Sequence, residues 1–448
     1  MTTIEITGGS LKDGKVEVVE HDSAPVWRDD GALHIVGQPY PRVEGVAKVT
    51  GRAQYSYDMR LPGQLYARVL RSPLPHARIR NIDTCRAAAL PGVRAVLTHE
   101  SAPKITWYED SFVFDPHLRF FGEEVAAVAA ESEEIADDAL RLIEVEYEPL
   151  PFVTDLDAAL RPDAPKLHPD GNIAGEPKQY ERGDIVAGFA DAEVTIDRVY
   201  TTHAALHNSL EPHGCTAMWD GDELTLWDST QSIFTVREEV ANKLGLLERQ
   251  VRVIKQFMGG GFGSKQISWK SDVIAALLAK ASGHPVQLML DREAENLAAG
   301  HRNLTHHHVR IGAKRDGTLT AIEADIHQGV GAHQAGGEGS DTAGTYQTLY
   351  RCPNVRTTQT GVFLNTGPAV AFRAPGYFEG AFALESAMDE LARELEIDPF
   401  TLRQRNYAER DQQSDKPYSR SDALRRCYES AHDAFGWDDR KASANQAT

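Results

Sequence analysis

The clearest pattern of apolar and polar positions lies in residues 122–150 (GEEVAAVAAESEEIADDALRLIEVEYEPL). The run VAAVAA is short and wholly apolar, which is typical of a buried strand. Ser132 then offers a helix N-cap and is followed by two acidic residues, which suit the positive end of a helix dipole. The stretch IEVEYEPL alternates as a half-buried strand does. This strand–helix–strand unit predicts a first α/β domain over residues 36–155.

A second set of patterns begins near residue 191 and predicts a second domain over residues 191–435. Turn residues DGDE between two apolar runs predict a hairpin. In the last helix, Phe382, Met388, Leu391 and Leu395 are compatible with a single buried face. The expected elements are strands in 192–203, 215–219, 224–229, 251–258 and 285–290, and helices over 235–244, 271–283 and 382–398.

The remaining segments are polar and weakly patterned. Residues 1–35 predict an extended leader or surface strap, and residues 156–190, rich in Pro, Asp and Gly, predict a connector. The end of the chain, 436–448, is small and polar and predicts a tail.

Composition excludes several classes of protein. The chain has 448 residues, and its formal net charge of −19 disfavours a nucleic-acid partner. Its four cysteines are scattered without CxxC spacing, so an internal iron–sulfur site, a zinc ribbon or a disulfide framework is not expected. We expect reduced, buried thiols in the cytoplasm. There is no apolar run long enough for a membrane span and no export signal, although export with a partner subunit stays open.

The segment QFMGGGFGSKQ (256–266) contains four glycines. Such a density of glycine indicates that the backbone bends sharply or comes very close to another group. A phosphate-binding Walker loop needs Ser or Thr after its lysine, but Gln266 follows Lys265. The dinucleotide fingerprint GxGxxG also fails, because its sixth position falls on Ser264 or Gln266. A glycine-rich turn that serves only close packing remains the alternative.

Two further positions favour a binding site over a turn that serves only close packing. Gln231 follows the apolar strand LTLWDS, where an amide offers both a donor and an acceptor. Arg373 follows another apolar run, in AVAFRAPG, and carries a permanently charged fork. Taken singly, each has a plainer interpretation, a surface glutamine and a structural ion pair.

Two groups of histidines are spaced closely enough to suggest metal binding, but neither forms a recognisable metal motif. His306, His307 and His308 lie in HHHVRIG, which is typical of a strand and would send neighbouring side chains to opposite faces. His203, His207 and His213 lack the HExxH helix of a zinc protease, so we expect core or surface histidines. Glu211 is expected to give structural support.

Taken together, the chain resembles the molybdenum-binding (large) subunit of the xanthine dehydrogenase/aldehyde oxidase family, over its amino-terminal half only. The resemblance runs from about 36 to 407 and is carried by VGQPYPRVEGVAKVTGRAQYSYD, YEPLPFVTDLDAAL, NSLEPHGCTAMWDGDELTLWDSTQ, FMGGGFGSK and AFRAPGYFEGAFALESAMDELARELEIDPFTLRQRNY. It implies a mixed α+β and α/β fold, a hammerhead domain followed by the first molybdenum-cofactor-binding domain.

The resemblance also implies roles for particular residues. Gln231 would act beside the metal as a catalytic and cofactor-binding residue. Gly261, Phe262, Gly263 and Arg373 would complete the cofactor site, and no protein atom would ligate the metal directly. The residues expected in the substrate pocket are Gln266, Ala374 and Pro375.

Three departures from the family pattern bear on the substrate. Purine-oxidising members carry a glutamate where this chain has Gln266, and an aromatic residue where it has Pro375. Carbon monoxide dehydrogenases carry a cysteine where it has Ala374. An aldehyde or a small N-heterocycle is therefore the expected substrate.

The family implies a larger assembly than this chain. Its members use molybdenum-molybdopterin, here expected in the cytosine dinucleotide form, and pass electrons to 2Fe-2S clusters and FAD, which would lie on partner subunits. The family's second cofactor domain and its base glutamate have no counterpart here. A second polypeptide in a split subunit is the favoured interpretation. A truncated product, a non-catalytic scaffold half-subunit and, more weakly, a nucleotide-binding module are the alternatives.

Overall fold

The structure is a computed structural model that describes residues 2–7, 15–20, 34–108, 111–336, 339–418 and 423–440. It contains two compact units, Met1–Ala53 and Gln54–Thr448, which are described separately. In the first unit, β1 (Thr2–Thr7) pairs antiparallel with β2 (Lys15–Glu20), and α1 (Gly45–Val49) lies near the end of the unit. The segment predicted as a polar leader thus includes a hairpin.

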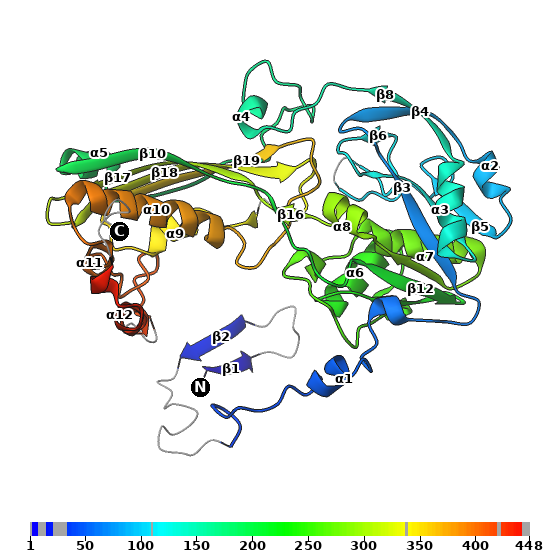
Figure 1. The fold of residues 1–448 in the computed structure, drawn as a ribbon, viewed down its shortest axis with the longest axis horizontal. Helices are drawn as coiled ribbons and strands as arrows, with labels where there is room; N and C mark the ends of the chain where they lie inside the picture. Colours follow the sequence, from blue (N-terminus) through cyan, green and yellow to red (C-terminus); the bar gives the residue numbers. More distant parts are fainter. Residues whose placement is uncertain are drawn as a thin grey trace. The chain divides into compact units, whose positions relative to one another are not determined.

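One mixed sheet in the second unit, called the first sheet here, has the strand order β14-β13-β12-β15-β3-β7-β5 (Figure 1). The β13–β14 and β15–β3 pairs are parallel, and the other neighbours are antiparallel. The strands are β3 (Leu65–Arg71), β5 (Val93–Thr98), β7 (Glu124–Ala130), β12 (Gly214–Asp220), β13 (Glu223–Asp228), β14 (Val251–Ile254) and β15 (Val286–Met289). The sheet therefore joins strands from both sides of the predicted connector.

Both faces of the first sheet are covered. Helix α7 (Lys270–Ser282) packs on one face with α6 (Ile233–Leu244), and nine of its thirteen residues are buried. On the other face lie α3 (Glu133–Arg141), α2 (Cys85–Ala88) and a small sheet of order β6-β4-β8. Strand β7 is consequently buried along its whole length, which explains why its sequence is apolar without alternation. The small-sheet strands are β4 (Ala77–Asp83), β6 (His117–Leu118) and β8 (Glu144–Pro149).

The second sheet has the order β10-β17-β18-β19-β9, with only its β18–β19 pair parallel. Helix α10 (Tyr377–Leu395) packs along it together with α9 (Gly344–Thr348) and α11 (Pro399–Arg405) (Figure 1). Ala383, Leu384, Met388 and Leu391 form the buried face of α10. The strands are β9 (Lys178–Arg182), β10 (Val194–Thr202), β17 (Thr305–Ala313), β18 (Leu319–Gly331) and β19 (Val355–Phe363).

Short elements complete the unit. The pair β11 (Ala205–Leu206) and β16 (His301–Arg302) forms a small antiparallel ladder. The other elements are α4 (Leu156–Ala159), α5 (Ile185–Ala190), α8 (Arg292–Ala298), α12 (Ala423–Phe435), and the 3₁₀ turns η1 (Ser56–Asp58), η2 (Glu248–Gln250), η3 (Ser264–Gln266) and η5 (Trp437–Asp439).

Local predictions and observed elements agree closely over most of the second unit. The Ser132 cap is confirmed, because its side chain accepts a hydrogen bond from the amide of Ile135. The hairpin after residue 220 and the helices predicted over 235–244 and 271–283 are confirmed as well. Two differences stand out. The segment 156–190 contributes α4, β9 and α5, and Phe382 is not on the buried face of α10 but 48% exposed.

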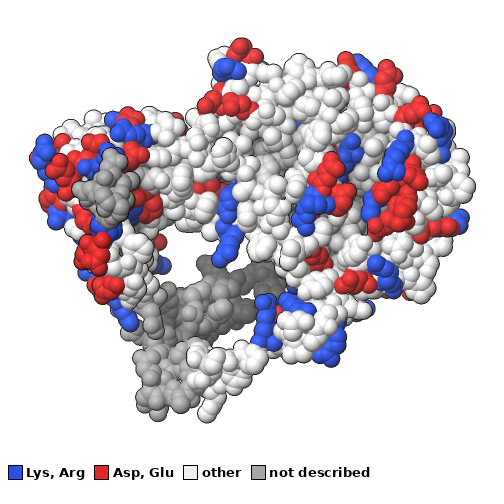
Figure 2. Space-filling model, in the orientation of Figure 1, with Lys and Arg blue, Asp and Glu red and all other residues white. Residues whose placement is uncertain are grey.

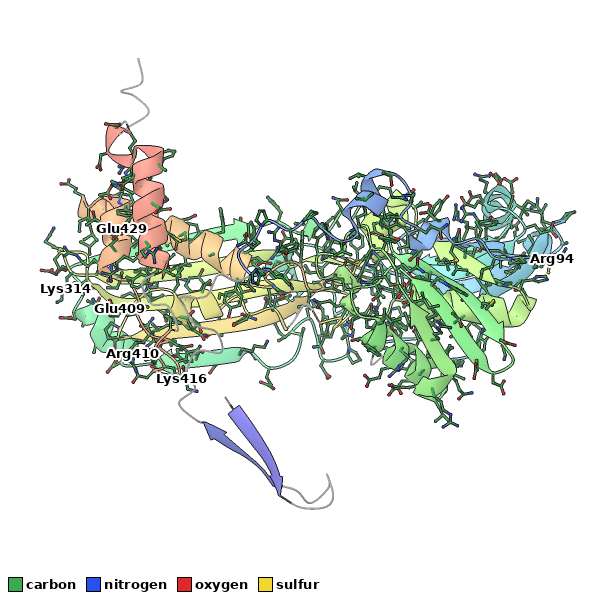
Figure 3. All side chains as sticks on the ribbon, turned by 90° about the horizontal axis from the view of Figure 1, so that it is seen from below. Arg94, Lys314, Glu409, Arg410, Lys416 and Glu429 are labelled. Carbon is green, nitrogen blue, oxygen red and sulfur yellow. The ribbon has the colours of Figure 1, made fainter. Side chains whose placement is uncertain are left out.

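Charged side chains lie mainly outside these layers. On the face shown in Figure 2, acidic and basic residues are interspersed over the described surface. Figure 3 shows Lys314, Glu409, Arg410, Lys416 and Glu429 at the periphery of the part built on the second sheet. None of the helices in the described residues is long and apolar enough to cross a membrane.

Candidate functional site

The glycine loop after β14 has a backbone that few side chains would permit. Phe262 has a positive φ of 51°, and Gly263 has a φ of 121°. A Cβ atom on Gly263 would lie 2.2 Å from the carbonyl oxygen of Ala371, and one on Gly261 would lie 2.5 Å from Oε1 of Gln231. The loop therefore needs glycine at both positions, because other parts of the chain occupy the space.

Gln231 holds this loop from the end of β13. Its Oε1 accepts hydrogen bonds from the amides of Gly263 at 2.8 Å and Lys265 at 3.3 Å. The main-chain N–H of Gln231 donates to the carbonyl of Lys265 at 2.7 Å. These contacts fix the orientation of the side-chain amide, because two N–H groups face its oxygen. The NH₂ group of Gln231 has no hydrogen-bond partner among the described residues.

Beneath the loop, Glu211 and Lys265 form a buried support. Glu211 accepts from the amide of Gly259 through Oε2 at 2.7 Å and from the amide of Ser56 through Oε1 at 3.0 Å. Lys265 is 1% exposed, and its Nζ donates to the carbonyl of Glu211 at 2.7 Å and to Oγ of Ser229 at 2.6 Å. Burial lowers the pKa of Lys265. The lysine thus points into the core, unlike a phosphate-binding lysine, and the structural role predicted for Glu211 is confirmed.

The segment around Arg373 lies directly against the loop. The amide of Arg373 donates to the carbonyl of Phe262 at 2.7 Å. Ala374 follows with a left-handed φ of 59°, and Gly376 with a φ of 83° leads into α10. Left-handed backbone is unusual for alanine and marks a strained turn. The turn projects the Arg373 guanidinium outward, where it has no ion-pair partner among the described residues.

A cavity of about 750 Å³ opens between the loop and the turn. Its lining includes four aromatic residues, Phe262, Phe372, Tyr377 and Phe378, together with Arg373 and Ala374. A largely apolar cavity with a few fixed polar groups is the usual form of a small-molecule site.

Two buried polar side chains also border the cavity. The Arg302 guanidinium donates to Oε2 of Glu379 at 2.9 Å and to the carbonyl of Arg373 at 2.8 Å. It stacks against the ring of Phe372, at 4.4 Å from the centroid. His207 contacts the carbonyl of Ala371 through Nε2 at 2.9 Å, and burial lowers its pKa. Since a carbonyl oxygen can only accept, Nε2 carries the proton of a neutral ring.

Most of the residues selected from the sequence come together here. Gln231, Gly261 and Gly263 form the loop contact, while Phe262, Arg373 and Ala374 line the cavity. Pro375 and Gln266 do not line it; Gln266 is exposed at the end of η3.

Sequence reasoning missed Arg302, Glu379 and His207 as parts of this site. The only local signal for Arg302 is a polar triplet, His301-Arg302-Asn303, directly after the small-residue run LAAG. Glu379 looks like an ordinary acidic residue in the first turn of a helix.

The histidine triplet has a structural arrangement. His306 and His308 are paired with Asp157 and Asp197 at the surface. His307 is buried between Oγ1 of Thr305 and the hydroxyl of Tyr346. In the described part of the chain, no group of three or more His, Cys, Asp or Glu residues could hold a metal ion. All four cysteines are free: Cys215 and Cys352 are buried as expected, but Cys85 and Cys427 are exposed.

Two family models match most of the chain. Residues 50–151 match the family model described as aldehyde oxidase and xanthine dehydrogenase, a/b hammerhead domain, and residues 167–407 match the molybdopterin cofactor-binding domain. The chain belongs to the xanthine dehydrogenase/aldehyde oxidase family. The predicted fold, a hammerhead domain followed by a molybdenum-cofactor-binding domain, is confirmed.

Relatives in this family are molybdenum-binding subunits of oxidoreductases. The chain is 35% identical to the probable hypoxanthine oxidase XdhD of Escherichia coli (strain K12), covering 86% of this chain and 45% of the relative. It is 33% identical to the nicotinate dehydrogenase large molybdopterin subunit of Eubacterium barkeri, covering 82% of this chain and 88% of that subunit. The chain thus spans about half the length of the first relative and most of the second.

Solved structures give the same result for the fold. Quinoline 2-oxidoreductase from Pseudomonas putida 86 superposes with a TM-score of 0.80 at 28% identity, over 89% of this chain and 54% of that one. The aldehyde oxidoreductase from Desulfovibrio gigas also gives a TM-score of 0.80 at 28% identity, over 90% of this chain and 47% of that one.

The residues at the site fit a molybdopterin group. The glycines let the loop pack against Gln231 and the Ala371 carbonyl, and Gln231 keeps an NH₂ donor without a hydrogen-bond partner among the described residues. Amide donors and guanidinium groups bind oxygen-rich groups, and the exposed Arg373 side chain lines the same cavity.

Proposed function

We propose that the chain supplies the amino-terminal half of the cofactor site of a molybdenum hydroxylase that oxidises an aldehyde or a small N-heterocycle, and that a second polypeptide supplies the rest. When bound, molybdenum-molybdopterin, in the cytosine dinucleotide form, would provide the redox chemistry of the hydroxylation. Residues of this chain would bind the group, orient it and exclude water around it.

The observation that carries this proposal is the hydrogen bonding of Gln231. Its oxygen is used by the loop, so its NH₂ group is held in a fixed direction without a partner. A donor that is fixed before the reaction stabilises negative charge that develops on a nearby oxygen, and no reorganisation is needed. Gln231 would therefore act on the reacting oxygen, while Gly261, Phe262, Gly263 and Arg373 would hold the cofactor.

The cavity supports the proposed substrate class. Its aromatic walls suit a planar or apolar molecule, and Ala374 leaves the mouth beside Arg373 open. Pro375 and Gln266 lie outside the lining in this chain, so their proposed contacts with substrate require walls from the second polypeptide. Pro375 stands where purine-oxidising members carry an aromatic residue, which favours an aldehyde or a small N-heterocycle over a purine ring.

Electrons would leave through 2Fe-2S and FAD partner subunits, and the assembly would be cytoplasmic. The four cysteines support separate cluster subunits, because two are buried singly and two are exposed and free. The match to the Eubacterium barkeri subunit over 88% of its length supports a split molybdenum subunit, because a relative of similar extent carries the name large molybdopterin subunit.

The test is to produce the chain with its candidate partner subunits under conditions for cofactor maturation. We expect molybdenum in the purified complex, a pterin dinucleotide released on denaturation, and oxidation of aldehydes or N-heterocycles with an artificial electron acceptor. A matured complex without molybdenum would instead support the scaffold alternative, and retained nucleotide on the chain alone would support a nucleotide-binding module.

A further inference from the structure

The turn from Arg373 to Gly376 has a strained backbone. Ala374 has a left-handed φ of 59°, and Gly376 has a φ of 83°. Left-handed backbone is unfavourable for alanine, so such a turn persists only where surrounding groups fix it. Because the turn follows Arg373 directly, the contacts that hold it also determine where the Arg373 guanidinium points.

Hydrogen bonds hold this turn at both ends. The amide of Arg373 donates to the carbonyl of Phe262 at 2.7 Å, and the amide of Asp341 donates to the carbonyl of Pro375 at 3.3 Å. In addition, Nη2 of Arg302 donates to the carbonyl of Arg373 at 2.8 Å. The first two contacts use main-chain amides, which nearly every residue type supplies. The third depends on one side chain, and Arg302 is therefore the position where a substitution can release the turn.

Arg302 is itself fixed on several sides. Its side chain is 8% exposed, and its Nη1 donates at 2.9 Å to Oε2 of Glu379, a buried residue in the first turn of α10. The rings of Phe372 and Phe378 lie with their centroids 4.4 Å and 5.0 Å from its Cζ. A guanidinium is planar, so a carboxylate on one nitrogen and nearby rings also set the direction of the other nitrogen. The Glu379 carboxylate thus aims the donor that holds the Arg373 carbonyl.

This arrangement is costly for an ion pair that only stabilises the fold. Two buried charges lose their hydration, and apolar residues of similar size often stabilise a protein as well. Burial raises the pKa of Glu379 even though Arg302 lies beside it. What apolar residues could not supply is a directed donor for the carbonyl of Arg373.

We propose that Arg302 is a positioning residue of the cofactor site, anchored by Glu379, which holds the turn after Arg373 so that the Arg373 guanidinium faces the cofactor. This inference rests on the proposed function, in which Arg373 helps to hold molybdopterin. The two donors of Arg302 described above are directed at protein atoms, so Arg302 acts on the cofactor through Arg373. A turn released from Arg302 would leave the cation at the cavity but no longer in a fixed direction.

The experiment compares two variants whose effects on stability and on the turn are opposite. In the double variant Arg302→Met with Glu379→Leu, both buried charges are gone, so stability should be close to that of the wild type, but the carbonyl of Arg373 has lost its donor. In Glu379→Gln, an unpaired buried charge lowers stability, but the amide oxygen still anchors Arg302. The matched control is Arg198→Met, which breaks the exposed pair of Arg198 with Glu390 on the same helix.

Amide hydrogen exchange of residues 372–378 is measured on the full chain alone, and the loss of molybdenum with time is measured on the matured complex. We expect the double variant to exchange these amides and to lose molybdenum about tenfold faster than the wild type, because one charged hydrogen bond is missing. Glu379→Gln and Arg198→Met should stay within about twofold of the wild type in both measurements. Glu379→Gln should nevertheless melt at a lower temperature than the double variant.

Normal exchange of the turn in the double variant, or fast exchange in Glu379→Gln, would overturn the positioning role. If the double variant does not fold, Arg302→Met takes its place, because it also removes the donor and, like Glu379→Gln, leaves one buried charge unpaired. Equal exchange in these two single variants would then overturn the role.

The loss of molybdenum separates this inference from the proposed function. Fast exchange of the turn without faster loss of molybdenum would overturn the positioning of the cofactor, while the bound molybdenum would still support the proposed function. A matured wild-type complex that contains no molybdenum would overturn the proposed function and this inference with it.

Discussion

The guanidinium of Arg302 donates to the main-chain carbonyl of Arg373 at 2.8 Å and thereby ties a buried ion pair to a strained turn. The ion-pair partner, Glu379, lies in the first turn of α10 with its side chain 1% exposed. The shape of the cavity wall therefore depends on a charge pair that contributes no atom to the glycine loop.

Replacing Arg302 by Met should cost about 3–5 kcal/mol in the free energy of unfolding, because Glu379 would stay buried without a partner. Urea denaturation measures this cost. The matched control is Arg198→Met, which breaks the exposed pair with Glu390 and should cost less than about 1 kcal/mol. Similar losses in the free energy of unfolding for the two variants would show that burial does not set the contribution of the Arg302–Glu379 pair.

Two substitutions of Gln231 should separate its two hydrogen-bonding roles. In Gln231→Glu, an oxygen remains for the amides of Gly263 and Lys265, so stability should change by less than about 1 kcal/mol. Turnover of the assembled enzyme should fall about 10²–10³-fold, because the NH₂ donor is lost. In Gln231→Leu, both amides lose their acceptor, and stability should fall by about 2 kcal/mol as well. Full activity of Gln231→Glu would show that the NH₂ group has no catalytic role.

Alanine at Gly263 should be far more harmful than alanine at another left-handed glycine. Both Gly263 and Gly245 have positive φ, but nothing lies within 4 Å of a Cβ atom on Gly245. Gly245→Ala should therefore cost only about 1 kcal/mol of backbone strain. In Gly263→Ala the new methyl group collides with the carbonyl of Ala371, and we expect a loss of about 3 kcal/mol or more. Thermal and urea unfolding of the pair give the comparison, and equal losses would mean that the two segments can separate freely.

Acid should weaken the fold through His307. Burial lowers the pKa of this imidazole to about 4, whereas in the unfolded chain it is about 6.5. Between these values the unfolded state binds a proton that the folded state does not, so the free energy of unfolding falls as pH falls, by about 3 kcal/mol in total. His117, His207 and His301 also have lowered pKa values and add to the acid loss in every variant. Urea unfolding from pH 7 to pH 4.5 should therefore show a loss in His307→Gln that is smaller than that of the wild type by about 3 kcal/mol. The exposed neighbour gives the control: His308→Gln should keep the pH dependence of the wild type.

Local sequence signals predicted the elements that depend on local chemistry. The cap at Ser132 and the turn after Asp220 act within a few residues, so their patterns could be interpreted directly. Phe382 was assigned to the wrong face of α10, because helical spacing alone does not say which of two apolar faces meets the core. The pairing of β15 with β3 could not be predicted either, since it joins Val286 to Leu65 without a signal in either strand.

In the candidate site, too, some residues could be identified from the sequence and others only from the fold. Gln231, the glycine loop and Arg373 stood out because their residue types are unusual where they occur and because they matched a family pattern. Arg302 and Glu379 lie 77 residues apart and look like ordinary charged residues in the sequence. Only the folded chain shows that they share one ion pair and one wall of the cavity.

The parallel pairing of β3 with β15 has a consequence for how the chain is made. β3 meets its partner only after more than two hundred further residues have been synthesised. During that time it exposes an open strand edge, on which another chain can pair. The first domain of this protein therefore cannot finish folding on the ribosome before the glycine loop has emerged, and a fragment ending near residue 155 should need a chaperone or aggregate.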